Sequence, residues 1–84
     1  MEQVTYCERM RAVREAARLS QEDLSKLSGV PRTSISRYER GETTPSMYNM
    51  IDIARVLHLT LGQLVGVEQI PANWSKQWED RKYE

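Results

Sequence analysis

Apolar residues near the start of the chain recur at the spacing of a helix that buries one face. Four of them follow one another at intervals of four, three and four residues: Tyr6, Met10, Val13 and Ala17. This spacing places them on one side of an α-helix. Thr5 and Glu8 match a capping box, in which side chains accept hydrogen bonds from amides at the helix start. The pattern predicts a first helix over about 5–18.

A shorter apolar pattern follows between a start signal and a glycine. Ser20 is a favourable N-cap, and Asp23 places a negative charge where the helix dipole favours it. Leu24 and Leu27 lie one turn apart, and we expect both to face inward. Gly29 then ends the second helix, because glycine readily takes the positive φ angle of a helix C-terminus.

A third helix is predicted to begin after Pro31, whose fixed φ angle suits the first position of a helix. This helix carries Ile35 and Tyr38 at core-facing positions and ends at Gly41. A proline at the start gives the helix no side-chain cap, in contrast to the serine that precedes the second helix.

Two more helices are predicted after a loop over 42–45. Ser46 caps the fourth helix, whose apolar positions come at helical spacing: Met47, Met50, Ile53, Ala54 and Leu57. Thr60 and Gln63 form another capping box, which starts a fifth helix of one or two turns through Leu61 and Leu64. Five helices with short loops and no convincing strand predict an all-α, compact five-helix bundle.

The chain of 84 residues suffices for one small domain. We expect this domain over 1–66 and a C-terminal tail over 67–84. Trp74 and Trp78 lie four residues apart in the tail, with Ile70 one turn earlier. They could pack back onto the bundle, form a two-fold interface with another copy as an extra dimerisation helix, or belong to a flexible segment that engages another protein.

Composition excludes several classes of protein. One cysteine, Cys7, and one histidine, His58, cannot build a disulfide framework or a Cys/His metal cage. Carboxylates do not form an acid–base arrangement, so we expect no enzyme, no cofactor and no small-molecule ligand. No apolar run approaches the ~20 residues of a membrane span, and no signal peptide is evident. We therefore expect a cytoplasmic protein that does not bind membranes.

Charge is unevenly distributed although the net charge is zero. Through residue 41 the chain has eight basic and six acidic residues, and the remainder has four basic and six acidic residues. The segment 29–41 holds three arginines and a single acid, Glu39. Such a mild asymmetry predicts limited non-specific affinity for DNA at physiological salt.

A short helix, a tight turn with glycine and a second helix over 20–41 have the layout of a DNA-binding helix-turn-helix. The sequence over about 10–64 resembles the phage Cro and repressor type (Xre-type) helix-turn-helix family. The resemblance is carried by LSQEDL at 19–24, SGV at 28–30, SISRYERG at 34–41 and PSM at 45–47. It implies a bundle of the lambda-repressor-like DNA-binding type. Pro31, Ser25 and His58 depart from the family pattern, and His58 replaces the glycine that usually ends helix four.

The resemblance also implies roles for individual residues. The positions that face base edges in the family are here Arg32, Thr33, Ser36 and Arg37. The positions that contact phosphates are Gln21, Arg40, Thr43 and Thr44. Arg14 and Glu39 match a partly buried structural ion pair between the first helix and the end of the recognition helix.

These residues predict a small, sequence-specific transcriptional regulator, a repressor by resemblance, that binds operator DNA through the major groove. A single module buries about 600–1,000 Å² on DNA, so tight binding would favour a homodimer on an inverted repeat. The alternative is a protein-interaction module, such as an antitoxin or anti-regulator, that retains the fold and uses the Trp74 and Trp78 tail to bind its partner.

Overall fold

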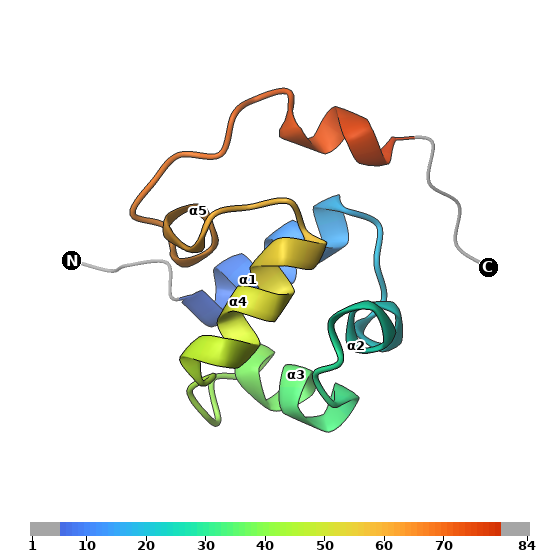
Figure 1. The fold of residues 1–84 in the computed structure, drawn as a ribbon, viewed down its shortest axis with the longest axis vertical. Helices are drawn as coiled ribbons and strands as arrows, with labels where there is room; N and C mark the ends of the chain where they lie inside the picture. Colours follow the sequence, from blue (N-terminus) through green and yellow to red (C-terminus); the bar gives the residue numbers. More distant parts are fainter. Residues whose placement is uncertain (1–5, 80–84) are drawn as a thin grey trace.

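Six helical segments follow one another in residues 6–79, the part of the chain that the computed structural model describes (Figure 1). They are α1 (Tyr6–Ala16), α2 (Gln21–Ser28), α3 (Arg32–Glu39), α4 (Met47–Val56), α5 (Leu61–Val65) and a 3-10 helix, η1 (Trp74–Trp78). Residues 6–79 contain no strand, and the predicted all-α bundle of five α-helices is confirmed. None of these helices is long and apolar enough to cross a membrane.

The starts of the helices follow from local hydrogen bonds. Ser20 Oγ accepts a hydrogen bond from the Asp23 amide (2.9 Å), and Asp23 Oδ2 accepts one from the Ser20 amide (3.2 Å). Thr60 and Gln63 form the same reciprocal box at the start of α5. Ser46 caps α4 through its side chain. The predicted starts of α2, α4 and α5 are confirmed, because capping needs only residues within one turn of each other.

The ends of two helices contain residues with positive φ angles that are not glycine. Arg18 has a φ of 60° and His58 a φ of 57°. His58, the second residue after α4, thus takes the left-handed conformation of the glycine that it replaces in the family pattern. At Arg18 the chain turns to bury Leu19, so α1 ends at Ala16 rather than at the predicted residue 18. The predicted cap at Thr5 lies outside the described residues.

The core draws side chains from all five α-helices. The largest fully buried ones are Met10, Leu19, Leu24, Val30, Ile35, Ile53, Leu57 and Leu64. Burying one such side chain stabilises the folded state by about 1.5–3 kcal/mol. α1 and α4 cross the middle of the bundle, and α2 and α3 lie together at one end (Figure 1). The core therefore packs against the buried side of α3.

Two residues that were expected to face inward are exposed. Leu27 remains 55% exposed and Met47 69%. α2 packs on α3 and α4 and buries Leu24, whereas Leu27, one turn later, stays uncovered. Met47 is the first residue of α4, and helix side chains lean toward the N-terminus, so it extends past the end of the helix. The spacing of apolar residues predicted which side of each helix faces the core. It did not predict how far along the helix other segments cover that side.

The tail folds back onto the bundle at the end opposite α3 (Figure 1). Trp78 is buried and joins the same apolar core as Leu57. Trp74 Nε1 donates a hydrogen bond to the Leu57 carbonyl (2.8 Å), and the Trp78 ring packs on the His58 ring with centroids 5.1 Å apart. Of the three alternatives for the tryptophans, the structure confirms the first, in which they pack back onto the bundle. The division of the chain into 1–66 and 67–84 remains a prediction.

Candidate nucleic-acid interface

The turn between α2 and α3 sets the direction of α3. Gly29 has a φ of 80°, and its amide donates a hydrogen bond to the Ser25 carbonyl (2.8 Å), which ends α2. Val30 follows and is 1% exposed, so the turn is anchored in the core. Pro31 occupies the N-cap of α3 and makes no side-chain hydrogen bond there, as predicted for a proline start. α3 therefore follows a turn that is held to the core by Val30, while Gly29 and Pro31 on either side are exposed.

One side of α3 is buried and the other faces outward. Ile35 is fully buried and Tyr38 is 6% exposed. Asn49 Nδ2 of α4 donates a hydrogen bond to the Tyr38 hydroxyl (2.7 Å), a contact that the pattern of apolar residues did not predict. Because residues three apart lie on one side of a helix, the intervening polar residues point away from the core.

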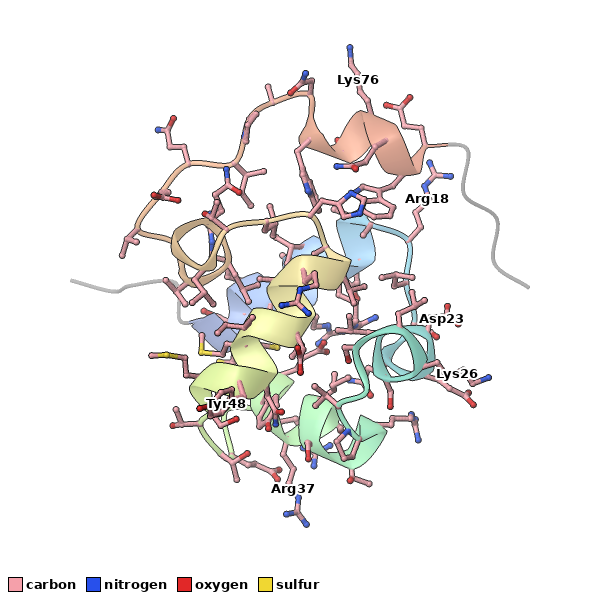
Figure 2. The ribbon with its side chains drawn as sticks, in the orientation of Figure 1. Arg18, Asp23, Lys26, Arg37, Tyr48 and Lys76 are labelled. Atoms are coloured by element: carbon pink, nitrogen blue, oxygen red, sulfur yellow. The ribbon has the colours of Figure 1, made fainter. Side chains whose placement is uncertain are left out.

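The outward side of α3 forms a shallow depression of about 300 Å³. We call this surface the arginine face, and it is lined by Arg32, Thr33, Ser36, Arg37 and Arg40. The structure thus brings the four residues expected to contact bases together with one expected to contact phosphate. Arg37 points away from the body of the molecule (Figure 2). The contacts of these residues with DNA remain predictions.

A buried ion pair fixes the back of α3 to α1. Arg14 Nε lies 2.7 Å from Glu39 Oε2, and Arg14 Nη2 lies 3.0 Å from Glu39 Oε1, so the pair is bidentate. The side chains are only 9% and 3% exposed. Arg14 Nη1 also donates to the Leu19 carbonyl (2.7 Å). Such a pair is costly to break, because removal of one partner leaves a buried charge without compensation.

Gln21, a predicted phosphate contact, joins this network. Its Nε2 donates a hydrogen bond to Glu39 Oε1 (3.0 Å), which the sequence did not reveal. A side-chain amide has two N–H groups. One therefore holds Gln21 against the end of α3, and the other remains for a further acceptor. The bond to Glu39 restricts the orientation of Gln21, the first residue of α2.

Arg40, the predicted phosphate contact at the C-cap of α3, is engaged within the protein. Its Nε lies 2.7 Å from Glu42 Oε2 and its Nη2 lies 3.2 Å from Glu42 Oε1. Nη1 donates to the Ser36 hydroxyl. The hydrogen bond and the charge of Glu42 raise the pKa of Arg40, and the hydrogen bond from Arg40 lowers the pKa of the Glu42 carboxyl. Glu42 was not predicted from the sequence as part of the site.

Thr43 and Thr44 lie in the exposed loop between α3 and α4. They are not among the residues that line the depression. The buried Pro45 and the cap Ser46 fix the end of this loop at the start of α4. Within residues 6–79, histidine, cysteine and carboxylate side chains form no group that could hold a metal ion.

This arrangement of helices is that of a known family. The profile of the helix-turn-helix family matches residues 10–64. The chain belongs to this family. The match begins in α1 and ends in α5, and it includes the whole pair of α2 and α3.

Two curated relatives are regulators by name. The chain is 41% identical over 54 residues to an uncharacterized HTH-type transcriptional regulator, y4dL, of Sinorhizobium fredii, a match that covers 64% of this chain and 28% of the relative. It is 34% identical over 59 residues to the cryptic phage CTXphi transcriptional repressor RstR of Vibrio cholerae, covering 70% of this chain and 53% of the relative. The chain thus spans about a quarter of the length of the first relative and about half of the length of the second.

The fold is also that of a solved repressor. The P22 c2 repressor protein, in a crystal structure with a synthetic operator, superposes with a TM-score of 0.72. The sequences are 30% identical, and the match covers 79% of this chain and all of that one (100%). The lambda-repressor-like type of bundle is therefore confirmed.

Proposed function

We propose that this protein is a transcriptional regulator that binds double-stranded DNA with α3 in the major groove. The observation that carries the proposal is the arginine face, in which Arg32 and Arg37 are exposed on a helix whose other side is buried. B-DNA has a major groove about 12 Å wide, which admits one helix. The described part of the tail, residues 67–79, packs at the opposite end of the bundle and leaves this face uncovered (Figure 1).

The proposal divides the polar residues into two kinds of contact. Arg32 and Arg37 each present a guanidinium fork that suits the O6 and N7 atoms of guanine, worth about 1–3 kcal/mol of discrimination apiece. Thr33 and Ser36 face the neighbouring bases. Gln21 at the start of α2, together with Arg40 and the loop with Thr43 and Thr44, contacts phosphates, which set the register of the helix without specifying sequence.

The family supports this proposal. Of the relatives similar to this chain, one is named a transcriptional regulator and one a transcriptional repressor. The P22 c2 repressor has been crystallised with an operator. We infer the same partner for this chain, with a homodimer on an inverted repeat, because one module buries too little surface for tight binding. We assign repression rather than activation, a cytoplasmic site of action and no enzymatic activity.

The alternative of a protein-interaction module depends on the tail. Trp78 is buried in the core of its own chain. Trp74 is half-buried, and its indole N–H donates a hydrogen bond to the Leu57 carbonyl. These side chains therefore present little apolar surface to a partner. No other observation on residues 6–79 favours an antitoxin or anti-regulator over a DNA-binding protein.

Selection of bound sequences from a random pool of double-stranded DNA, followed by titration of the selected site, tests the proposal. We expect an enriched palindromic site whose affinity falls steeply with salt. Arg32→Ala and Arg37→Ala should each cost about 1–3 kcal/mol and relax the preference at one base pair. Lys76→Ala removes the same charge at the other end of the molecule (Figure 2) and should change little. Unchanged affinity in both arginine variants would refute the proposal.

A further inference from the structure

A carboxylate lies beside the arginine face, where DNA binding would not favour one. Two acidic residues follow Ile35 before α4 begins, Glu39 and Glu42. The Glu39 carboxylate is engaged in the buried ion pair with Arg14. The Glu42 side chain is 50% exposed and adds its negative charge to the surface that we propose for DNA. Its position therefore calls for a role other than core packing.

The backbone holds Glu42 in place. α3 ends in a Schellman motif, in which the Gly41 amide bonds to the Tyr38 carbonyl (3.1 Å) and the Glu42 amide bonds to the Arg37 carbonyl (2.9 Å). Gly41 supplies the positive φ angle of 75° that this motif requires. The Cα atom of Glu42 is thus fixed relative to the last turn of α3, within reach of Arg40.

Glu42 occupies one bidentate edge of the Arg40 guanidinium, the edge formed by Nε and Nη2. The Glu42 carboxylate accepts hydrogen bonds from Nε and Nη2, at 2.7 and 3.2 Å, and the Ser36 hydroxyl accepts one from Nη1. A phosphate presents two oxygens in the same bidentate geometry to a guanidinium edge. The same N–H groups cannot point at both anions. A phosphate that reaches this edge must therefore displace Glu42.

We propose that Glu42 is a built-in competitor for a DNA phosphate at Arg40, which lowers the affinity of this protein for all DNA. The proposal rests on the proposed function. Phosphate contacts carry no sequence information, so the competition weakens binding to matched and unrelated DNA by the same factor. The hydrogen bond from Arg40 also lowers the pKa of Glu42, so the competitor stays ionised at neutral pH. Glu42 thereby limits retention of the protein on non-specific DNA and leaves the selection of a site to Arg32 and Arg37.

Substitution of Glu42 in the full chain tests the competition. Glu42→Gln keeps the shape of the side chain and removes its charge. We expect both matched and unrelated DNA to bind about twofold to fivefold more tightly at low salt, the range for an exposed ion pair. The gain should shrink as salt rises, because exposed charges are screened. Glu15→Gln is the matched control, since Glu15 forms an exposed ion pair with Arg11 on α1 (3.3 Å) and lies outside the arginine face.

A double-mutant cycle with Arg40→Ala separates competition from general repulsion between Glu42 and DNA. Competition requires that Glu42→Gln tighten binding much less when Arg40 is absent. An equal gain with and without Arg40, or no gain beyond that of Glu15→Gln, overturns the proposal. So does a gain for unrelated DNA alone.

The outcome also distinguishes failure of this inference from failure of the proposed function. If the unaltered protein binds a selected site and loses affinity on Arg32→Ala, but Glu42→Gln changes nothing, only the competition is refuted. If no DNA is selected at all, both proposals fall. A DNA-free measurement of the Glu42 carboxyl pKa by NMR, which should rise in Arg40→Ala, tests the ion pair itself; no rise would also refute the competition.

Discussion

The two ends of the molecule use short helices in opposite ways. At one end, α3 buries Ile35 and leaves its arginines on the surface. At the other end, η1 buries Trp78 and half of Trp74 against the end of α4. Both segments have polar and aromatic or aliphatic residues at helical spacing, so local pattern alone does not separate them. A side chain becomes available to a partner only where no other segment of the chain covers it.

The two ends also differ in how their polar groups are held. Behind α3, Arg14, Glu39 and Gln21 join three helices through charged hydrogen bonds. At η1, the contacts include a ring pair, one indole hydrogen bond to Leu57, and a hydrogen bond between His58 Nδ1 and Gln77 Oε1 (2.6 Å). We therefore expect loss of the network behind α3 to threaten the whole fold, and loss of the tail contacts to spare α3.

Glu39→Ala should have the largest effect on stability. It leaves Arg14 buried without its carboxylate and removes the partner of Gln21, so we expect a loss of about 3–5 kcal/mol in the free energy of unfolding. Urea denaturation followed by circular dichroism measures it. Glu15→Ala, which breaks an exposed pair, should cost less than about 1 kcal/mol. Equal costs for the two variants would show that the network does not hold α3.

Trp78→Ala should have the second largest effect. Truncation of a buried tryptophan leaves a cavity, and we expect a loss of about 3 kcal/mol. DNA affinity at a temperature where the variant is folded should not change, because the tail lies at the end opposite α3. Denaturation and a DNA titration on the same sample measure both quantities. A parallel loss of DNA affinity in the folded variant would show that the two ends are coupled.

Arg18→Gly should have the smallest effect and the opposite sign. Arg18 is exposed and has a φ of 60°, which costs an L-residue about 1–2 kcal/mol relative to glycine. We expect the free energy of unfolding to rise by about 1 kcal/mol or less, since glycine also gains entropy in the unfolded chain. His58 has nearly the same φ, but His58→Gly removes the contact with Trp78, so the gain should vanish there. Thermal denaturation of both variants measures the difference.

Much of the fold could be predicted because its signals are local. Ser20 with Asp23 and Thr60 with Gln63 lie within one turn of each other, so their hydrogen bonds depend on neighbouring residues alone. Leu27 and Met47 could not be placed in the same way. Their exposure depends on where other helices stop covering α2 and α4, which no window of the sequence contains.

The residues of the candidate site also divide into those that the sequence predicted and those that it did not. The residues of the arginine face were predicted from a family resemblance, and they meet on one helix because their spacing is helical. The bond from Gln21 to Glu39 was missed, since it joins residues 18 positions apart whose side chains meet only when α2 packs against α3. Glu42 was missed for another reason. Its pairing with Arg40 needs the turn at Gly41, and the family resemblance implies phosphate contacts in the loop over 42–45 only for Thr43 and Thr44.

By itself, the sequence determined the class of the fold, the starts of α2, α4 and α5, and the set of arginines on α3, because caps and helical spacing act over one or two turns. Only the tertiary structure decided that Trp78 is buried in its own chain and that Glu39 is shared by Arg14 and Gln21. These outcomes depend on which surfaces meet in three dimensions. Desolvation and charge pairing then select partners that local pattern leaves open.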